Sequence, residues 1–261
     1  MRNSNNTMHK HSSLKQSIIR IYTRIFRERV PNFRSVTRLF RNKYGIEIGG
    51  PSRMFSYKGL IPVYMVIKKL DGCNYSAQTI WEKTKSSESN LKYSCLKEGS
   101  QFISDATDLS QLPDAKYDFI ISSNCLEHIA NPFKALQEWL RVIKKDGLIL
   151  LVLPNKDFCF DRNRPVTKFS HLLSDFENDT PENDLTHLDE ILSLHDIKMD
   201  KQAGTLEQFK ARSLNNIENR ALHHHVFDLE LLCEIYNHFN LKILKTYKKG
   251  QDYIILGKKN D

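Results

Sequence analysis

The chain has 261 residues, of which 40% are hydrophobic, 10% aromatic and 27% charged, and its net charge is +8. This composition indicates a globular protein with a substantial core and excludes an intrinsically disordered chain. No apolar run reaches the roughly 18 residues of a membrane span. The five scattered cysteines include no C-x-x-C pair, which favours reduced thiols and a cytosolic protein.

The positive charge is concentrated at the N-terminus. Residues 1–43 carry eleven Lys and Arg and one acidic residue, Glu28, so the rest of the chain has a net charge of −2. Between Leu14 and Val30, apolar and basic residues alternate at helical spacing before Pro31, which predicts a basic amphipathic helix. That helix either lies on an anionic membrane surface or packs on the main domain. The segment has few aromatics for stacking, so we expect no nucleic-acid partner.

From residue 43 onwards, predicted strands and helices alternate. A first strand includes Ile46 and Ile48, a second covers residues 60–71, a weaker third covers residues 101–110, and a fourth covers residues 117–123. A helix over residues 132–144 and an apolar strand over residues 147–154 follow, and residues 241–247 and 252–259 form a closing antiparallel pair. This order predicts an α/β fold with a Rossmann-like, doubly wound, mostly parallel sheet.

Two further segments complete the predicted organisation. Residues 1–42 form a basic helical extension, and residues 43–261 form the main domain. Within that domain, residues 156–228 are polar and rich in His, Asp, Asn and Arg. An insertion of this size between sheet strands is typical of a lid or a substrate-binding segment.

The first predicted strand runs into glycines, in the stretch GIEIGGPS. It is neither G-x-G-x-x-G nor G-x-x-x-x-G-K-[ST], and Pro51 removes an N–H donor, which argues against a diphosphate ligand. Asp71 ends the second strand, where an acid can accept hydrogen bonds from a ribose diol, and Asp105 follows the third. The alternatives are an ordinary turn at Asp71-Gly72 and a helix cap at Asp105. A ligand with a ribose and a base but no diphosphate is predicted, and S-adenosylmethionine (SAM) fits this description.

The chain resembles the class I SAM-dependent methyltransferases over about residues 43–261. The resemblance rests on IEIGG and on YDFIISSNCLEHIANPFKALQEWLRVIKKDGLILLVLP, and Pro51 stands where the family usually has a third glycine. The stretches LDGCNYSAQTIWE, FDRNRPVTKFSHLLSDF, DLTHLDEILSLHD and HHHVFD are similar to a bacterial group associated with surface-glycan synthesis.

The resemblance implies a cofactor site made by eight residues. It implies that the methionine part of SAM is flanked by Glu47, Gly49 and Gly50 and that the ribose hydroxyls are held by Asp71. It also implies that the adenine is faced by Asp105 and Ala106 and that the floor is lined by Ser123 and Asn124.

Methyl transfer to an oxygen requires a positioned nucleophile and usually a base. If DLTHLDEILSLHD is one helix, its histidines share a side with Asp184. We expect His128 to be structural, and we predict that the base is one of the histidines of the insertion: His187, His195, His171 or His225. We predict no metal site, because the first two lie too far apart on a helix to share one ion.

Together these observations predict a cytosolic SAM-dependent methyltransferase that methylates a sugar hydroxyl in glycan biosynthesis. Its partner would be a sugar or glycan acceptor, and residues 14–30 would contact the inner face of the membrane if their helix binds lipid. Two alternatives remain: a non-catalytic scaffold with this cofactor fold tethered to the membrane, and a nicotinamide-dependent sugar-modifying enzyme. The missing G-x-G-x-x-G counts against the latter.

Overall fold

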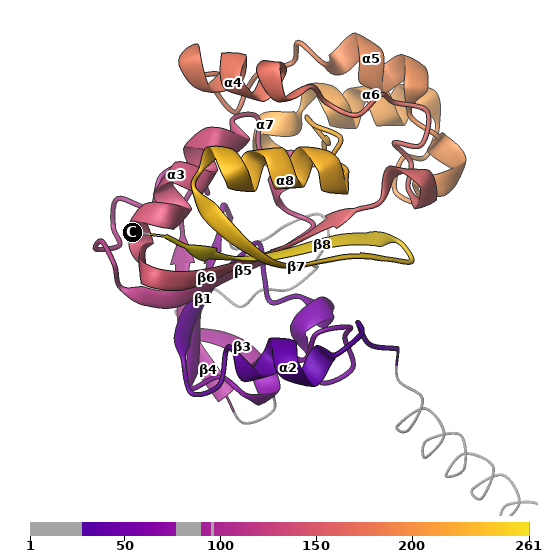
Figure 1. The fold of residues 1–261 in the computed structure, drawn as a ribbon. Coiled ribbons are helices and arrows are strands. Elements are labelled where there is room, and N and C mark those ends of the chain that lie inside the picture. Colours follow the sequence, from indigo (N-terminus) through magenta and orange to yellow (C-terminus); the bar gives the residue numbers. More distant parts are fainter. Residues whose placement is uncertain (1–27, 77–89, 95–96, 261) are drawn as a thin grey trace, which may run out of the picture.

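An eight-stranded sheet, in the order β3-β4-β2-β1-β5-β6-β8-β7, forms the centre of the protein (Figure 1). The structure is a computed structural model that describes residues 28–76, 90–94 and 97–260. The parallel strands are β1 (Tyr44–Ile48), β2 (Lys69–Asn74), β4 (Lys97–Ile103), β5 (Tyr117–Ser123) and β6 (Ile143–Pro154). Antiparallel pairing adds β3 (Asn90–Ser94), β7 (Leu241–Lys249) and β8 (Asp252–Lys259). The predicted fold class is confirmed.

Apolar side chains cover both faces of this sheet. Asn131 caps α3 (Pro132–Val142) by accepting a hydrogen bond from the Lys134 N–H, and α3 buries Phe133, Leu136 and Trp139 against one face. The same face is covered by α8 (Leu229–His238). The other face packs against α2 (Phe33–Arg38) and the short helical turns η1 (Arg53–Phe55) and η2 (Val63–Met65). The layers therefore leave the carboxyl ends of the parallel strands for a ligand.

Residues 156–228, which we call the cap, are gathered beyond α3 and α8 in Figure 1. The cap contains α4 (Phe169–Glu177), α5 (Leu188–Leu194), α6 (Leu206–Leu214) and α7 (Asn216–Asn219), with the turns η4 (Lys156–Phe158) and η5 (Ile197–Met199). It has a small core of its own, made of Ile191, Ala203, Phe209 and Leu222. The polar insertion is therefore a folded unit rather than a long connector.

Four elements differ from the sequence prediction. The third strand, predicted over residues 101–110, is β4 and covers Lys97–Ile103. Residues 60–67 do not form a strand, because Pro62 precedes the turn η2, and β2 begins only at Lys69. The helix α5 covers only Leu188–Leu194, and β6 begins at Ile143 rather than at residue 147. The predicted basic helix falls almost entirely on residues 1–27, outside the described residues. Among the residues that are described, no helix has both the length and the apolar character to cross a membrane.

Candidate active site

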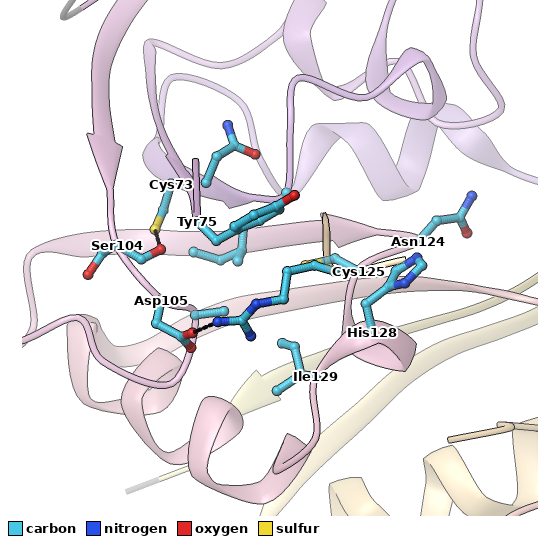
Figure 2. Close-up of a pocket in the computed structure, with 13 residues that line it drawn as sticks. Cys73, Tyr75, Ser104, Asp105, Asn124, Cys125, His128 and Ile129 are labelled. Atoms are coloured by element: carbon cyan, nitrogen blue, oxygen red, sulfur yellow. Dashed lines mark hydrogen bonds and ion pairs between the residues drawn. The ribbon is translucent and has the colours of Figure 1, made fainter. Parts of the chain in front are cut away.

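A pocket opens where β1, β2, β4 and β5 end, between the last residues of these strands and the cap (Figure 2). Figure 2 shows Cys73, Tyr75, Ser104 and Asp105 on one side and Asn124, Cys125 and His128 on the other. The complete lining is Ile48, Gly49, Cys73, Asn74, Tyr75, Ser104, Asp105, Ala106, Asn124, Cys125, His128, Ile129 and Arg220. Four of the eight predicted cofactor residues lie here, namely Gly49, Asp105, Ala106 and Asn124.

Gly49 allows the backbone to pass close to this pocket. Its φ of +79° lies in the left-handed region, and a Cβ built on it would be 2.9 Å from both Cβ and Sγ of Cys125. Its N–H donates to the Cys73 carbonyl at 2.9 Å, which ties the turn to the end of β2. Only glycine meets both requirements without strain.

The cap reaches the pocket through Arg220. The Arg220 guanidinium donates to Asp105 at 2.9 Å and also binds Glu182 (Figure 2 shows the bond to Asp105). It lies 5.6 Å from the centre of the Tyr75 ring, whose hydroxyl donates to the Asn219 carbonyl. On the far wall, the Trp139 indole N–H donates to the Ala106 carbonyl at 2.9 Å. The loop after β4 is thus fixed by both α3 and the cap.

Asp71 does not lie at the pocket, which corrects its predicted role at the ribose. It is 1% exposed in the middle of β2, and it accepts hydrogen bonds from the hydroxyls of Tyr44 and Tyr117 and from the Ser100 N–H. Burial would raise the pKa of this carboxyl, but the hydrogen bonds from Tyr44 and Ser100 lower it. The residue that ends β2 is Asn74, whose amide N–H donates to the Gly50 carbonyl at 2.9 Å.

Three more predicted cofactor residues lie outside this pocket. Glu47 is fully buried and accepts hydrogen bonds from the Ser52 N–H at 2.8 Å and from the Tyr64 hydroxyl at 2.6 Å. A Cβ on Gly50 would meet that Glu47 side chain, so Gly50 lets the turn fold over the carboxylate. Both residues shape the turn from behind, and Ser123 belongs to a second pocket.

The second pocket is more polar and adjoins the first through Asn124, which lines both. Its lining is Glu28, Ser52, Arg53, Met54, Lys58, Gly59, Leu60, Ser123, Asn124, Lys249, Gly250, Gln251 and Asp252. Burial raises the pKa of Asp252 to about 6, with a further contribution from the nearby Glu28 carboxylate. A carboxyl near neutral pKa in a polar pocket is a functional-site candidate.

The four histidines predicted to include the base do not line either pocket. His195 is 4% exposed, bonds to Asp200 at 3.2 Å and stacks between Phe160 and Phe209. It follows α5, whereas His187 precedes it, so the predicted shared helix face is wrong. His187 instead gathers with the other two, His171 and His225, around Asp175.

His128 was expected to be structural, yet it lines the first pocket. Its Nδ1 lies 2.9 Å from the Leu222 carbonyl and therefore carries the proton of the neutral ring, while burial holds its pKa well below the usual value. Behind it, His223 bonds to Asp161. Burial alone would lower the pKa of His223, but the Asp161 carboxylate raises it, and the net pKa lies above its usual value. The two carboxylate oxygens of the neighbouring Glu127 are buried without a hydrogen-bond partner among the described residues, and burial raises the pKa of this carboxyl to about 7.

Arg164 is a buried cation of the cap that lines neither pocket. Arg164 is 1% exposed and donates to Asp161 and Glu190 at 2.9 Å each and to the His223 carbonyl at 2.8 Å. These bonds occupy its guanidinium, so Arg164 holds the cap together rather than a ligand.

Comparison with known proteins identifies this region. Residues 59–151 match a family model described as a methyltransferase domain. This part of the chain is therefore similar to known methyltransferase domains. The match confirms the predicted enzyme class and, with it, the predicted cofactor, SAM. No curated protein sequence matches the chain.

Solved structures agree with the fold. A SAM-dependent methyltransferase from Mesorhizobium loti is similar with a TM-score of 0.50 and 8% identity, over 88% of this chain and 96% of that one. One from Methanosarcina mazei has a TM-score of 0.46 and 14% identity, over 87% and 97%. One from Thermotoga maritima has a TM-score of 0.45 and 14% identity, over 97% and 99%. The Mesorhizobium likeness supports the Rossmann-like fold alone.

The residues of the first pocket fit SAM. Ile48, Ala106 and Ile129 provide apolar walls for an adenine, and the Asp105 carboxylate stands beside them. The absence of a Cβ on Gly49 lets the turn pack against Cys125, which lines the same pocket. Asn74 lies at the end of β2, where an acidic residue was expected. Its amide N–H donates to the Gly50 carbonyl, so its side-chain oxygen is the atom that could accept a hydrogen bond from a ribose hydroxyl.

Proposed function

We propose that this methyltransferase methylates a hydroxyl of a sugar or glycan, with the acceptor bound in the second pocket. The observation that carries the proposal is that this polar pocket adjoins the cofactor pocket at Asn124 and contains Asp252. An apolar acceptor would not require a pocket with Arg53, Lys58 and Lys249 on its walls. A sugar carrying an anionic phosphate suits these cations and can also use the amide of Gln251.

Asp252 is the proposed general base. SAM, when bound, supplies an electrophilic methyl group. A hydroxyl held in line with that methyl forms the new carbon–oxygen bond as the carbon–sulfur bond breaks, and Asp252 takes the hydroxyl proton. The products are the methyl ether, S-adenosylhomocysteine (SAH) and the protonated carboxyl. Positioning supplies most of the acceleration and the base adds to it.

The charges around Asp252 decide when it can act as a base. The Glu28 carboxylate raises the pKa of Asp252. The same pocket is also lined by three cations, Arg53, Lys58 and Lys249. With a pKa of about 6, the carboxylate is mostly ionised at neutral pH while still able to hold a proton. The rate should therefore rise as the pH increases through about 6 and then level off.

The test is SAH formation by the full chain with SAM and a panel of sugars, sugar phosphates and nucleotide sugars, followed by mass and NMR analysis of the product. Asp252→Asn should lower kcat by about 10²–10⁴-fold and abolish the rise near pH 6, with SAH binding unchanged. Asp157→Asn, an exposed carboxylate outside both pockets, is the matched control. Undiminished kcat in Asp252→Asn would refute the base, and methylation at nitrogen or carbon would refute the acceptor class.

A further inference from the structure

Three histidines and one aspartate from separate parts of the cap meet in one cluster. His171 and Asp175 lie one turn apart on α4, His187 precedes α5, and His225 lies in the extended segment before α8. One nitrogen or oxygen from each of the four lies within 4.8 Å of the others. Neither pocket uses these residues, and methyl transfer as described above does not require them.

The distances in the cluster resemble those around a tetrahedral ion. Ligand atoms about 2.0–2.1 Å from a tetrahedral zinc ion are about 3.3 Å from one another. Here His171 Nε2 is 2.9 Å from His187 Nε2 and 3.3 Å from Asp175 Oδ2. One ring nitrogen of His225 lies within 4.8 Å of the other three donors. The two separations from His171 are close to the tetrahedral value, so side-chain rotations would suffice to bring the four donors around an ion.

The hydrogen bonding of the cluster is incomplete in the way a metal site would require. Asp175 Oδ2 and His225 Nδ1 are buried, and neither has a hydrogen-bond partner in the part of the chain that the structure describes. His225 lies with Nε2 3.0 Å from the Ala130 carbonyl, which fixes a proton on Nε2 and a lone pair on Nδ1. The other oxygen of Asp175 accepts from the Thr180 hydroxyl at 3.1 Å. Metal-ligating histidines and carboxylates are typically oriented by such bonds.

We propose that His171, Asp175, His187 and His225 bind one divalent cation of the zinc class. Imidazole donors favour zinc and neighbouring transition metals over magnesium or calcium, which prefer oxygen. Four protein ligands make a closed site, which is typical of a structural rather than a catalytic ion. The ion would join α4, the start of α5 and the segment that continues from Arg220, and so would fix the cap over the cofactor pocket.

The experiment uses the full chain purified without a histidine tag, stripped with a chelator and titrated with Zn²⁺ alone. We expect one zinc per chain by elemental analysis, and intense visible absorption from a tetrahedral centre when Co²⁺ replaces zinc. His171→Gln should weaken zinc binding more than about 100-fold, beyond the loss typical of an outer-sphere partner. The side chain of His171 is 40% exposed, so this variant should fold. The matched control is His238→Gln, an exposed histidine of α8.

Four results would overturn the proposal. The first three are the absence of tightly bound zinc in the native chain, equal zinc affinity in His171→Gln and His238→Gln, and the weak absorption of octahedral Co²⁺. Loss of binding in a His9→Gln/His11→Gln double variant would assign the metal to the N-terminal residues and would equally refute this site. None of these readouts depends on methyl transfer, so the proposed function can fail while the metal site stands, and the reverse also holds.

Discussion

Replacing Asp71 by alanine should destabilise the protein while leaving the cofactor affinity unchanged. The carboxylate accepts from the Tyr117 hydroxyl at 3.0 Å, from the Ser100 N–H at 3.0 Å and from the Tyr44 hydroxyl. Tyr117 is fully buried, so its hydroxyl would lose its acceptor without gaining water. A buried polar group left unsatisfied costs about 1–3 kcal/mol, and with two hydroxyls affected we expect the free energy of unfolding to fall by about 2–5 kcal/mol.

Two measurements check this prediction: urea unfolding, and calorimetric titration with SAH under conditions where each variant is folded. Tyr117→Phe removes one donor without emptying the site and should cost only about 1 kcal/mol, which keeps the test informative if Asp71→Ala fails to fold. Asn74→Ala, at the end of β2, should instead weaken SAH binding, and the lost hydrogen bond to the Gly50 carbonyl should cost about 1–3 kcal/mol of stability. A stable Asp71→Ala that no longer binds SAH would refute the reasoning and restore Asp71 as the ribose ligand.

Two further substitutions test the turn and the cap. Gly49→Ala should weaken SAH binding more than 10-fold by calorimetry, because the new methyl group would lie 2.9 Å from the Cys125 side chain and would displace that pocket-lining residue or the turn; left-handed backbone strain adds about 1–2 kcal/mol. The control is Gly250→Ala. Gly250 also has a positive φ, of +56°, but no atom lies within 4 Å of the new Cβ, so this variant carries the same backbone strain and should bind SAH normally. Phe209→Ala should destabilise the cap by about 3–5 kcal/mol in urea unfolding, and undiminished stability would refute a separate core there.

The strands whose sequences are apolar and uninterrupted could be predicted well. Residues 117–123 coincide with β5, and residues 252–259 coincide with β8, because buried strands have continuous apolar sequences with clear ends. The turn at Gly49 could also be predicted, because glycine permits the left-handed backbone conformation that this turn requires.

The end of β2 could not be predicted from local pattern. Residues 60–67 have the apolar composition of a buried strand. They instead form turns, and the side chains of Ile61, Val63 and Tyr64 pack against the sheet. The true strand is KLDGCN, whose Asp and Gly disfavour strand formation on their own. Tertiary pairing with β1 and β4 overrides this preference, and moving the end by three residues exchanges Asp71 for Asn74 at the pocket.

The histidines of the cap show a different limit. Their residue types indicated a polar site, and His171 and Asp175, four residues apart on α4, are in contact. The separation of His187 from His195 depends on where a seven-residue helix begins and ends, which sequence patterns locate poorly. The meeting of His225 with α4 is a long-range contact that no spacing encodes.

The hairpin between β7 and β8 links the acceptor pocket to the sheet. It looked like a simple connector, yet Gly250, Gln251 and Asp252 all line the second pocket. Its position is fixed by Asn155, whose N–H donates to the Gln251 carbonyl at 2.8 Å and whose amide reaches the Gly250 carbonyl at 3.3 Å. Because β8 pairs with β6 over Asp252–Lys258, the proposed base lies on a rigid element, in a pocket that Ser123 at the end of β5 also lines. Such a base can be placed precisely while the turn residues around it vary with the acceptor, without any change to the cofactor pocket on the other side of Asn124.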